Sequence, residues 1–158
     1  MIVRAYRPGD AQAVIDVIVP IQREEFGVSI TAEDQPDLAD IPGWYQTGAG
    51  QFWLAERDGL AVGTIALKDI GDGAVALRKM FVRPEGRGPA GAASALLATA
   101  LEHARAHGVR EIWLGTTDRF LAAHRFYEKN GFAQVEAGDL PAAFPRMAVD
   151  TRFYRLRL

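Results

Sequence analysis

The sequence predicts a mixed α/β (α+β) domain in which a set of antiparallel strands is followed by a parallel crossover. Three observations lead to this prediction. Residues 51–82 hold three β-rich runs separated by two turn signals, as expected for consecutive antiparallel strands. Residues 92–104 carry apolar side chains at helical spacing. The apolar run 111–115 follows this helix and is typical of a short buried strand.

The first third of the chain predicts a strand, a helix and an irregular segment. Residues 2–6 form a β-rich run that ends before Pro8. Asp10 can then cap a helix with apolar side chains at helical spacing as far as Ile21. The pattern weakens over residues 26–50, where prolines and glycines gather, so we expect one short helix within irregular chain.

The middle of the chain predicts the antiparallel strands 51–56, 60–68 and 74–82. Asp58-Gly59 is a strong hairpin signal between the first two strands, and the turn 71–73 contains two glycines.

The remainder predicts alternating helices and strands. Gly108 can end the helix that begins near Ala92. After the strand 111–115 we expect a helix over 119–129 and a final strand over 151–158. With 158 residues and no repeat or linker, residues 1–158 should form a single domain.

Composition excludes several classes of function. Eighteen basic and twenty acidic side chains give a net charge of −2, and no long basic run offers a nucleic-acid footprint. No apolar run approaches the roughly 20 residues of a membrane span, and the first residues lack a leader pattern, so we expect a cytoplasmic protein. The sequence contains no cysteine, which excludes disulfides, thiolate-zinc sites and cysteine nucleophiles.

A turn rich in glycine and alanine opens the helix that begins near Ala92. The segment 87–93 reads Arg-Gly-Pro-Ala-Gly-Ala-Ala. The first N–H groups of a helix attract anions, and small side chains let a pyrophosphate approach closely. Arg87 adds a fixed positive charge. Close packing of backbone is the alternative reading of such a turn, and the sequence lacks a Walker or dinucleotide-binding pattern.

A second motif, Ala123-His-Arg-Phe-Tyr-Glu-Lys-Asn-Gly-Phe132, follows in the expected order. Together the two motifs resemble those of the GNAT acetyltransferase family, and the resemblance covers essentially the whole chain. It implies the GNAT fold, with a mixed central sheet of about six to seven strands, an antiparallel N-terminal meander and helices on both faces. It further implies transfer of an acetyl group from acetyl-CoA to a primary amine by direct attack, without a metal.

The resemblance also implies roles for individual residues. Tyr127 holds the position of the acid that protonates the departing thiolate. The residues that would contact acetyl-CoA are Met80, Phe81, Val82, Arg87, Gly88, Pro89, Ala90, Gly91, Ala92, Ala93, Phe120, Ala123 and Phe126. A kinked or bulged strand at 80–82 could free an N–H group to stabilise the oxyanion.

Three positions depart from the family pattern. Ala90 and Ala92 replace glycines of the phosphate turn, or the turn carries one extra residue. Phe120 stands where many members have Asn. Ala76 stands where Glu is common, so that position offers no general base.

Other polar residues have competing interpretations. An acidic segment could attract a cationic amine and relay its proton, or could be a solvated face; its members are Glu24, Glu25, Glu33, Asp34, Asp37 and Asp40. Histidines 103, 107 and 124 are expected to serve the helix ends or packing rather than catalysis. Four aromatic residues could line an acceptor pocket or belong to the core: Trp44, Tyr45, Phe52 and Trp53.

Rival functions stay open at this point. A GNAT domain kept as a non-catalytic acyl-CoA sensor or interaction module would bind acyl-CoA without turnover. A transferase of longer acyl chains is a third reading. The acceptor could be a small molecule or a protein amine. The segment 140–145 could contact the acceptor or a second subunit of a homodimer.

Overall fold

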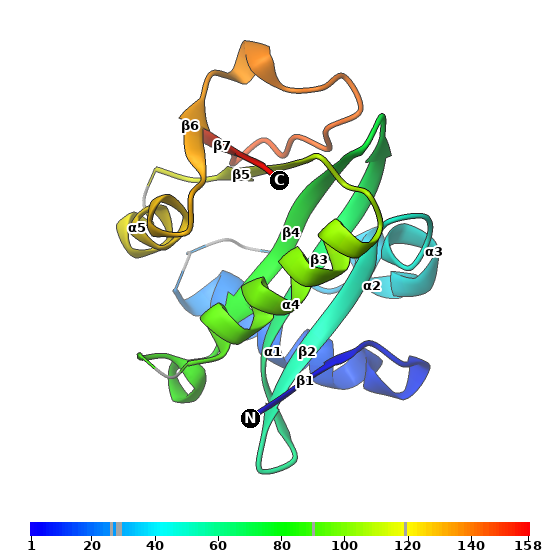
Figure 1. Ribbon diagram of the computed structural model, residues 1–158. Helices are drawn as coiled ribbons and strands as arrows, with labels where there is room; N and C mark the ends of the chain where they lie inside the picture. The colour runs from blue at the N-terminus through cyan, green and yellow to red at the C-terminus, as the bar shows by residue number, and fades with distance from the viewer. Residues whose placement is uncertain (26, 28–29, 90, 119) are drawn as a thin grey trace.

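The computed structural model describes residues 1–25, 27, 30–89, 91–118 and 120–158. Within these ranges the chain forms one sheet of seven strands in the order β1-β2-β3-β4-β5-β7-β6 (Figure 1). The strands are β1 (Ile2–Ala5), β2 (Gln51–Arg57), β3 (Leu60–Gly71), β4 (Ala74–Val82), β5 (Glu111–Thr116), β6 (Ala133–Val135) and β7 (Arg152–Arg157). Only β4 and β5 pair in parallel, and the other neighbours are antiparallel.

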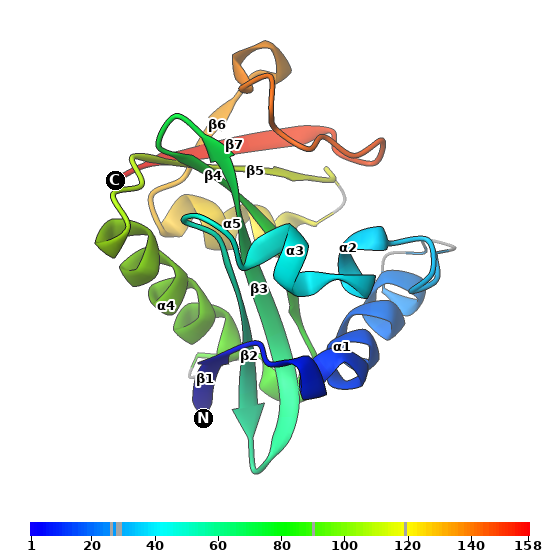
Figure 2. The same ribbon diagram turned by 90° about the vertical axis from the view of Figure 1, so that its right-hand side faces the viewer.

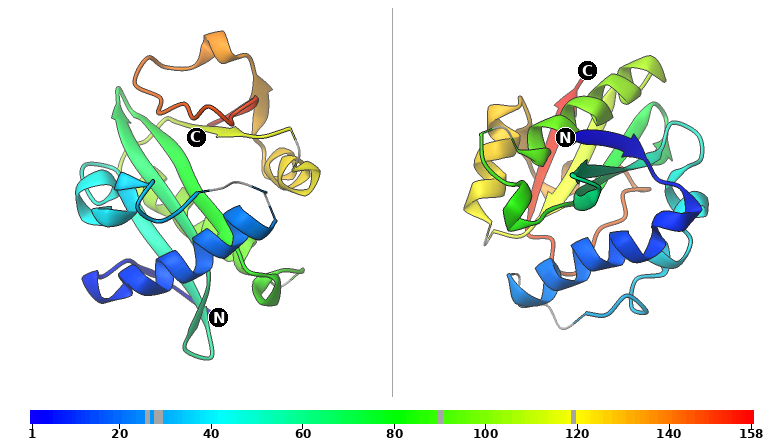
Figure 3. Two further views of the ribbon diagram at one scale, coloured as in Figure 1. Left: turned by 180° about the vertical axis from the view of Figure 1, so that it is seen from behind. Right: turned by 90° about the horizontal axis from the view of Figure 1, so that it is seen from below.

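Helices cover both faces of the sheet. They are α1 (Ala11–Glu24), α2 (Pro36–Ala39), α3 (Ile41–Tyr45), α4 (Ala92–Ala106) and α5 (Leu121–Lys129). Figures 2 and 3 show α1 and α3 on one side of the sheet and α4 on the other. The two apolar clusters divide in the same way. One joins α1, α2 and α3 to the sheet, and the other joins α4 and α5 to its opposite face; these are called the α1 face and the α4 face below.

The fold confirms the predicted mixed sheet, the antiparallel meander and the crossover, with four differences in detail. The segment 26–50 contains two short helices, α2 and α3, instead of one. Strand β3 continues to Gly71, three residues beyond its predicted end. Helix α5 begins at Leu121, and the predicted start at Arg119 lies outside the described residues. Strand β6 was not predicted, because a run of three residues is too short to show periodicity.

Strands β4 and β5 stay paired over only three residues. Their register joins Ala74 to Glu111, Val75 to Ile112 and Ala76 to Trp113, although β4 continues to residue 82. The two ribbons diverge beyond that point (Figure 1). The second half of β4 is therefore an edge on the side that β5 has left.

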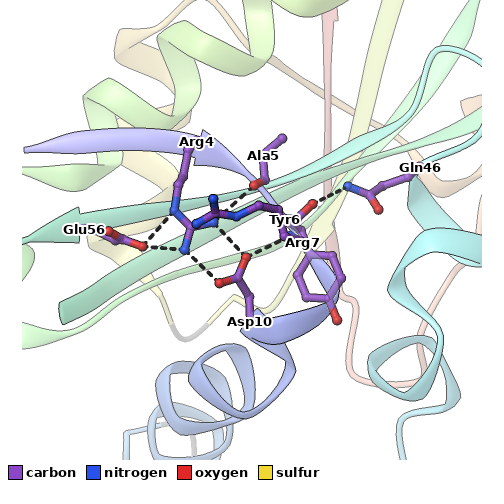
Figure 4. A network of polar contacts seen from close by, with 7 residues as sticks. All are labelled: Arg4, Ala5, Tyr6, Arg7, Asp10, Gln46 and Glu56. Carbon is purple, nitrogen blue, oxygen red and sulfur yellow. Dashed lines mark hydrogen bonds and ion pairs between the residues drawn. The ribbon is translucent and has the colours of Figure 1, made fainter. Parts of the chain in front are cut away.

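A corner of charged side chains joins the start of the chain to the sheet (Figure 4). Both terminal nitrogens of Arg4 donate to the Asp10 carboxylate at 2.7 Å, and Arg4 Nε donates to Glu56 at 2.8 Å. The Arg7 backbone N–H also donates to Asp10. Asp10 does precede α1, but its side chain makes no capping bond to that helix. The expected cap is therefore wrong, since Arg4 and Arg7 engage the carboxylate.

The Arg4–Asp10 pair predicts a pH-dependent stability. The hydrogen bonds from Arg4 hold the pKa of Asp10 below its usual value, with burial opposing them. Because the folded-state pKa lies below the unfolded value of about 3.9, the ionised carboxylate stabilises the fold above that pH. This contribution is lost as the pH falls through the folded-state pKa. Asp10→Asn should cost about 2 kcal/mol at neutral pH and less in acid, as measured by urea unfolding between pH 7 and pH 3.

Asp16→Asn is the matched control, because Asp16 lies exposed on α1 and meets only Gln12. Equal losses for Asp10→Asn at pH 7 and pH 3 would contradict the linkage.

Candidate functional site

The turn before α4 has the backbone that an anion-binding helix start requires. Gly88 has a φ of +112°, a backbone conformation that residues other than glycine adopt only with strain. A Cβ on Gly91 would lie 2.6 Å and 2.7 Å from the carbonyl oxygens of Gly86 and Gly88, so this position needs glycine for close packing. No side chain among the described residues caps α4. Its first N–H groups and the small Ala92 side chain thus suit a pyrophosphate.

The side chain of Arg87 lies between this turn and α1. Its Nε donates to the Val82 carbonyl at 2.9 Å, and its Nη2 pairs with Glu25 at 2.7 Å. The Arg87 side chain is 45% exposed, and an exposed ion pair contributes only about 0–1 kcal/mol. The guanidinium can therefore exchange Glu25 for a phosphate at little cost. Gly88 and Pro89 are exposed in the same turn, whereas Ala90 lies outside the described residues.

A β-bulge interrupts β4 at Lys79 and Met80. Thr64 of β3 pairs with Phe81 and Ala66 pairs with Arg78, so two residues of β4 lie opposite Ile65 alone. Lys79 has a φ of +54°, in the left-handed region. The Lys79 carbonyl accepts a hydrogen bond from Thr64 Oγ1 at 2.7 Å. A bulge takes peptide groups out of the ladder, and this one begins one residue before the predicted 80–82 and includes Met80.

A buried polar network holds the bulge from the α1 face. Lys79 Nζ donates to Gln35 Oε1 at 2.7 Å and pairs with Asp37 at 3.3 Å. The Tyr45 hydroxyl donates to the same Asp37 carboxylate at 2.5 Å. Gln35 and Gln22 exchange amide hydrogen bonds. Burial lowers the pKa of Lys79, and the charge of Asp37 opposes that shift.

Tyr127 lies buried on the α4 face. Its ring packs edge-on against Phe126 and Phe132 and lies tilted against Tyr154. Its hydroxyl makes no hydrogen bond to any residue that the structure describes. Burial raises the pKa of Tyr127 above the usual 10, so the phenol is protonated at neutral pH, although the same shift makes it a weaker acid than an exposed tyrosine.

The structure gathers part of the predicted set around one cluster. Met80, Val82, Ala123 and Phe126 all pack on the α4 face, as does the buried Ala92. Phe81 instead packs against the α1 face. The rest of the set lies close by: Ala93 is half-buried in the first turn of α4, and Phe120 is the half-buried residue that precedes α5.

The acidic segment is largely engaged by its own neighbours. Glu25 pairs with Arg87, and Asp37 pairs with Lys79 and Tyr45. Asp34 accepts from Thr31, and Asp40 caps α3 through the Gly43 N–H. Glu24 and Glu33 are exposed. Asp37 is therefore the one member that the fold buries, whereas the other five are exposed and only Glu25 among them forms an ion pair within the described residues.

The three histidines and most of the aromatic candidates take part in packing and hydrogen bonds within the fold. His124 is 3% exposed, with Nε2 donating to the Thr117 carbonyl and Nδ1 accepting from Arg152. The rings of His103 and His107 stack 4.0 Å apart. Of the four aromatic candidates, Tyr45, Phe52 and Trp53 are core residues, whereas Trp44 is half-buried beneath Lys68.

No group of three or more His, Cys, Asp or Glu side chains among the described residues could hold a metal ion. No helix in the same part of the chain is long and apolar enough to cross a membrane.

Sequence reasoning missed the Lys79 network. The only signal was a lysine placed inside an apolar strand beside Arg78. Neither Gln35 nor Thr64 carried a sequence signal, since their contacts with Lys79 span 44 and 15 residues.

Comparison with known proteins gives consistent matches. The sequence model of the acetyltransferase (GNAT) family matches residues 15–132. N-acetylaspartate synthetase from Rattus norvegicus is 37% identical over 131 residues, which cover 77% of this chain and 44% of that protein. The chain thus spans less than half the length of this relative.

Solved structures share the whole fold. A GNAT-family acetyltransferase from Staphylococcus aureus Mu50 is 37% identical, with a TM-score of 0.94 over 99% of this chain and 98% of that chain. N-acetylglutamate synthase from Neisseria gonorrhoeae, solved with coenzyme A and N-acetyl-glutamate, is 19% identical, with a TM-score of 0.75 over 99% of this chain and 35% of that chain. The second likeness concerns the fold alone, and both confirm the fold predicted from the sequence.

The Lys79 network predicts a large loss of stability on mutation. Lys79→Met leaves the buried Asp37 without its cation, and breaking a buried pair costs about 3–5 kcal/mol. Methionine and lysine are equally strained at the positive φ of this position, so the backbone strain does not contribute to the difference in stability between wild type and variant. Urea unfolding should show this loss.

Lys68→Met is the matched control, because Lys68 lies half-buried on β3 over the Trp44 ring and should change the unfolding free energy by less than about 1 kcal/mol. Similar losses for both variants would show that the network does not hold the bulge.

Proposed function

Because the chain belongs to the acetyltransferase (GNAT) family, we propose that it is an enzyme that transfers an acetyl group from acetyl-CoA to a primary amine. One observation carries the proposal. Strand β4 separates from β5 and is bulged just before the turn that begins α4, while α5 brings a buried phenol to the same face of the sheet. The relative's name, N-acetylaspartate synthetase, supports acetyl transfer to an amine.

The chain supplies groups for binding the cosubstrate. The N–H groups at the start of α4 and Arg87 hold the pyrophosphate. The apolar side chains of Met80, Val82, Ala123 and Phe126 flank the pantetheine arm between β4 and α5. The bulge at Lys79 and Met80 aims peptide groups toward the thioester.

The reaction needs two proton movements. The neutral amine attacks the thioester carbonyl carbon, so a C–N bond forms and a backbone N–H near the bulge stabilises the oxyanion. The C–S bond then breaks, and the sulfur takes the proton of the Tyr127 hydroxyl. The proton lost by the amine passes to water, and Tyr127 is reprotonated from solvent. The products are the acetylated amine and free CoA.

The remaining expectations about this protein belong to the same proposal. We place it in the cytoplasm as a single domain over residues 1–158. The acyl-chain preference and a homodimer are open to direct measurement by competition between acyl-CoAs and by sedimentation.

Tyr127→Phe tests the acid. The turnover number should fall about 100-fold, the usual contribution of a general acid, while the dissociation constant of acetyl-CoA stays unchanged. Because burial raises the pKa of Tyr127, the ratio of wild-type to variant rates should be the same at pH 7 and pH 9. Thiol release and calorimetry measure both quantities.

Tyr154→Phe is the control, since its ring packs against Tyr127 in the same cluster but its hydroxyl donates to Glu128. Equal rates for wild type and Tyr127→Phe would remove Tyr127 from the mechanism.

Arg87→Ala tests the phosphate contact. Loss of one charge-assisted hydrogen bond should raise the dissociation constant of acetyl-CoA about tenfold, which corresponds to about 1.4 kcal/mol. Arg105→Ala removes the same charge from the last turn of α4 and should leave that constant unchanged.

If wild type fails to bind acetyl-CoA in calorimetry, the proposed function is wrong. Binding without thiol release on any amine would instead support the acyl-CoA sensor.

A further inference from the structure

A row of register partners crosses the α1 face of the sheet. Lys68 of β3 pairs with Ala76 of β4, Ala76 pairs with Trp113 of β5, and Trp113 pairs with Arg155 of β7. Paired residues of neighbouring strands point to the same face. Ala76 and Trp113 are buried at the centre of the row, and Lys68 and Arg155 are half-buried at its two ends.

Arg78 belongs to the same face as this row. It lies two residues after Ala76 and before the bulge, and it pairs with Ala66, which packs in the α1-face cluster. Since side chains alternate along a strand, Ala76 and Arg78 share a face. Arg146 joins them from the segment before β7, because it lies over the ring of Phe153, two residues before Arg155.

The four cations of this face meet apolar partners instead of carboxylates. Lys68 lies over Trp44 at 5.2 Å, Arg146 over Phe153 at 5.0 Å and Arg155 over Trp113 at 5.4 Å. Arg78 Nη2 donates only weakly, to Met147 Sδ at 3.8 Å. Within the described ranges, none of the four forms an ion pair. We refer to Lys68, Arg78, Arg146 and Arg155 as the cationic face.

The acids near the cationic face are committed elsewhere. Glu111 pairs with Arg157 at 3.8 Å, and Asp37 with Lys79 and Tyr45. Asp150 accepts from the Met147 N–H, and burial raises its pKa, against the charges of Arg78 and Arg146. Asp150 thus lies near Arg78 and Arg146, and Asp69 near Lys68, but among the described residues neither acid forms an ion pair with these cations.

The cationic face adjoins the place where the acetyl group would be transferred. Arg78 and Phe81 lie opposite Ala66 and Thr64 across the bulge, so they are about two residue steps apart, roughly 7 Å at about 3.3 Å per residue, and an arginine side chain can span that distance. The segment between β6 and β7 closes the region from above, and Figure 2 shows it reaching toward the side of α1 and α3.

We propose that the cationic face binds the acceptor by its carboxylates, so that the acceptor is a small dicarboxylic amino acid whose α-amine is acetylated. Arg78 is the main ligand, since it can leave Met147 and grip a carboxylate with two parallel hydrogen bonds. Arg146 is the sequence neighbour of Met147, which Arg78 contacts, so two cations lie close together, and two cations favour an acceptor with two carboxylates. The inference rests on the proposed transfer reaction.

The test compares amines that differ only in their carboxylates. Thiol release and product mass are measured with L-aspartate and L-glutamate, their amides L-asparagine and L-glutamine, the decarboxylated β-alanine and 4-aminobutanoate, and the polyamine spermidine. We expect kcat/KM at least tenfold higher for the dicarboxylates than for the amides. The KM of the dicarboxylates should rise with salt.

Variants assign the effect to Arg78. Arg78→Met should raise the KM for the preferred dicarboxylate at least tenfold and leave the dissociation constant of acetyl-CoA unchanged. Arg78→Lys keeps the charge but not the two-pronged geometry and should show an intermediate KM. Arg105→Met, at the far end of α4, is the control for loss of one positive charge.

Two outcomes overturn the inference while the proposed function stands. These are equal or better turnover of spermidine or the amides, and a change of less than twofold in KM on Arg78→Met. If no amine turns over, calorimetry of L-aspartate and L-glutamate with the CoA-loaded protein decides the matter. Binding that Arg78→Met abolishes would support the anion site even if the transfer reaction fails, and absence of binding would overturn it.

Discussion

The bulge at Lys79 decides which residues of β4 face which side of the sheet. Before it, Val75 and Leu77 pack on the α4 face, and after it Met80 and Val82 pack there again. Without the extra residue, alternation would turn Met80 and Val82 to the α1 face and Phe81 away from it. A left-handed conformation at a residue other than glycine costs about 1–3 kcal/mol. The network of Lys79 with Gln35, Asp37 and the Thr64 hydroxyl offsets this cost.

This arrangement gives the two proposed substrates different sides of β4. The α4 face is apolar next to the bulge and ends at the glycine-rich turn, which suits an apolar arm with a pyrophosphate at its end. The α1 face carries Arg78 and Lys79 side by side, because the bulge follows Arg78 directly. Lys79 is buried and bonded to Gln35 and Asp37. The hydrogen bond of Arg78 goes to the Met147 thioether, and Arg78 forms no ion pair with the described residues. Because β4 and β5 are no longer paired after Ala76, the α1 face and the α4 face of the sheet meet at this edge of β4.

Sequence patterns predicted the features that depend on residues close together in the chain, such as turns and amphipathic helices. The meander followed from turn signals such as Asp58-Gly59, and α4 from its apolar spacing. Gly88 and Gly91 were recognisable because only glycine tolerates their geometry. The contacts that the sequence could not predict join distant segments. Arg87 meets Glu25, 62 residues away, and Lys79 meets Gln35, 44 residues away. Periodicity says nothing about such pairs.

Net charge was equally uninformative about the acceptor side. Twenty acids against eighteen bases suggest a mildly acidic surface, yet the tally omits how each acid is used. Asp37 is held by Lys79 and Tyr45 within the fold, and Glu25 is held by Arg87. Each such pairing removes a negative charge from the surroundings of β4 and leaves other cations uncompensated. Since charges at a partly buried surface interact more strongly than in bulk water, a dianionic acceptor gains most where Arg78, Arg146 and Arg155 form no ion pair with any described residue, and a polyamine gains least there.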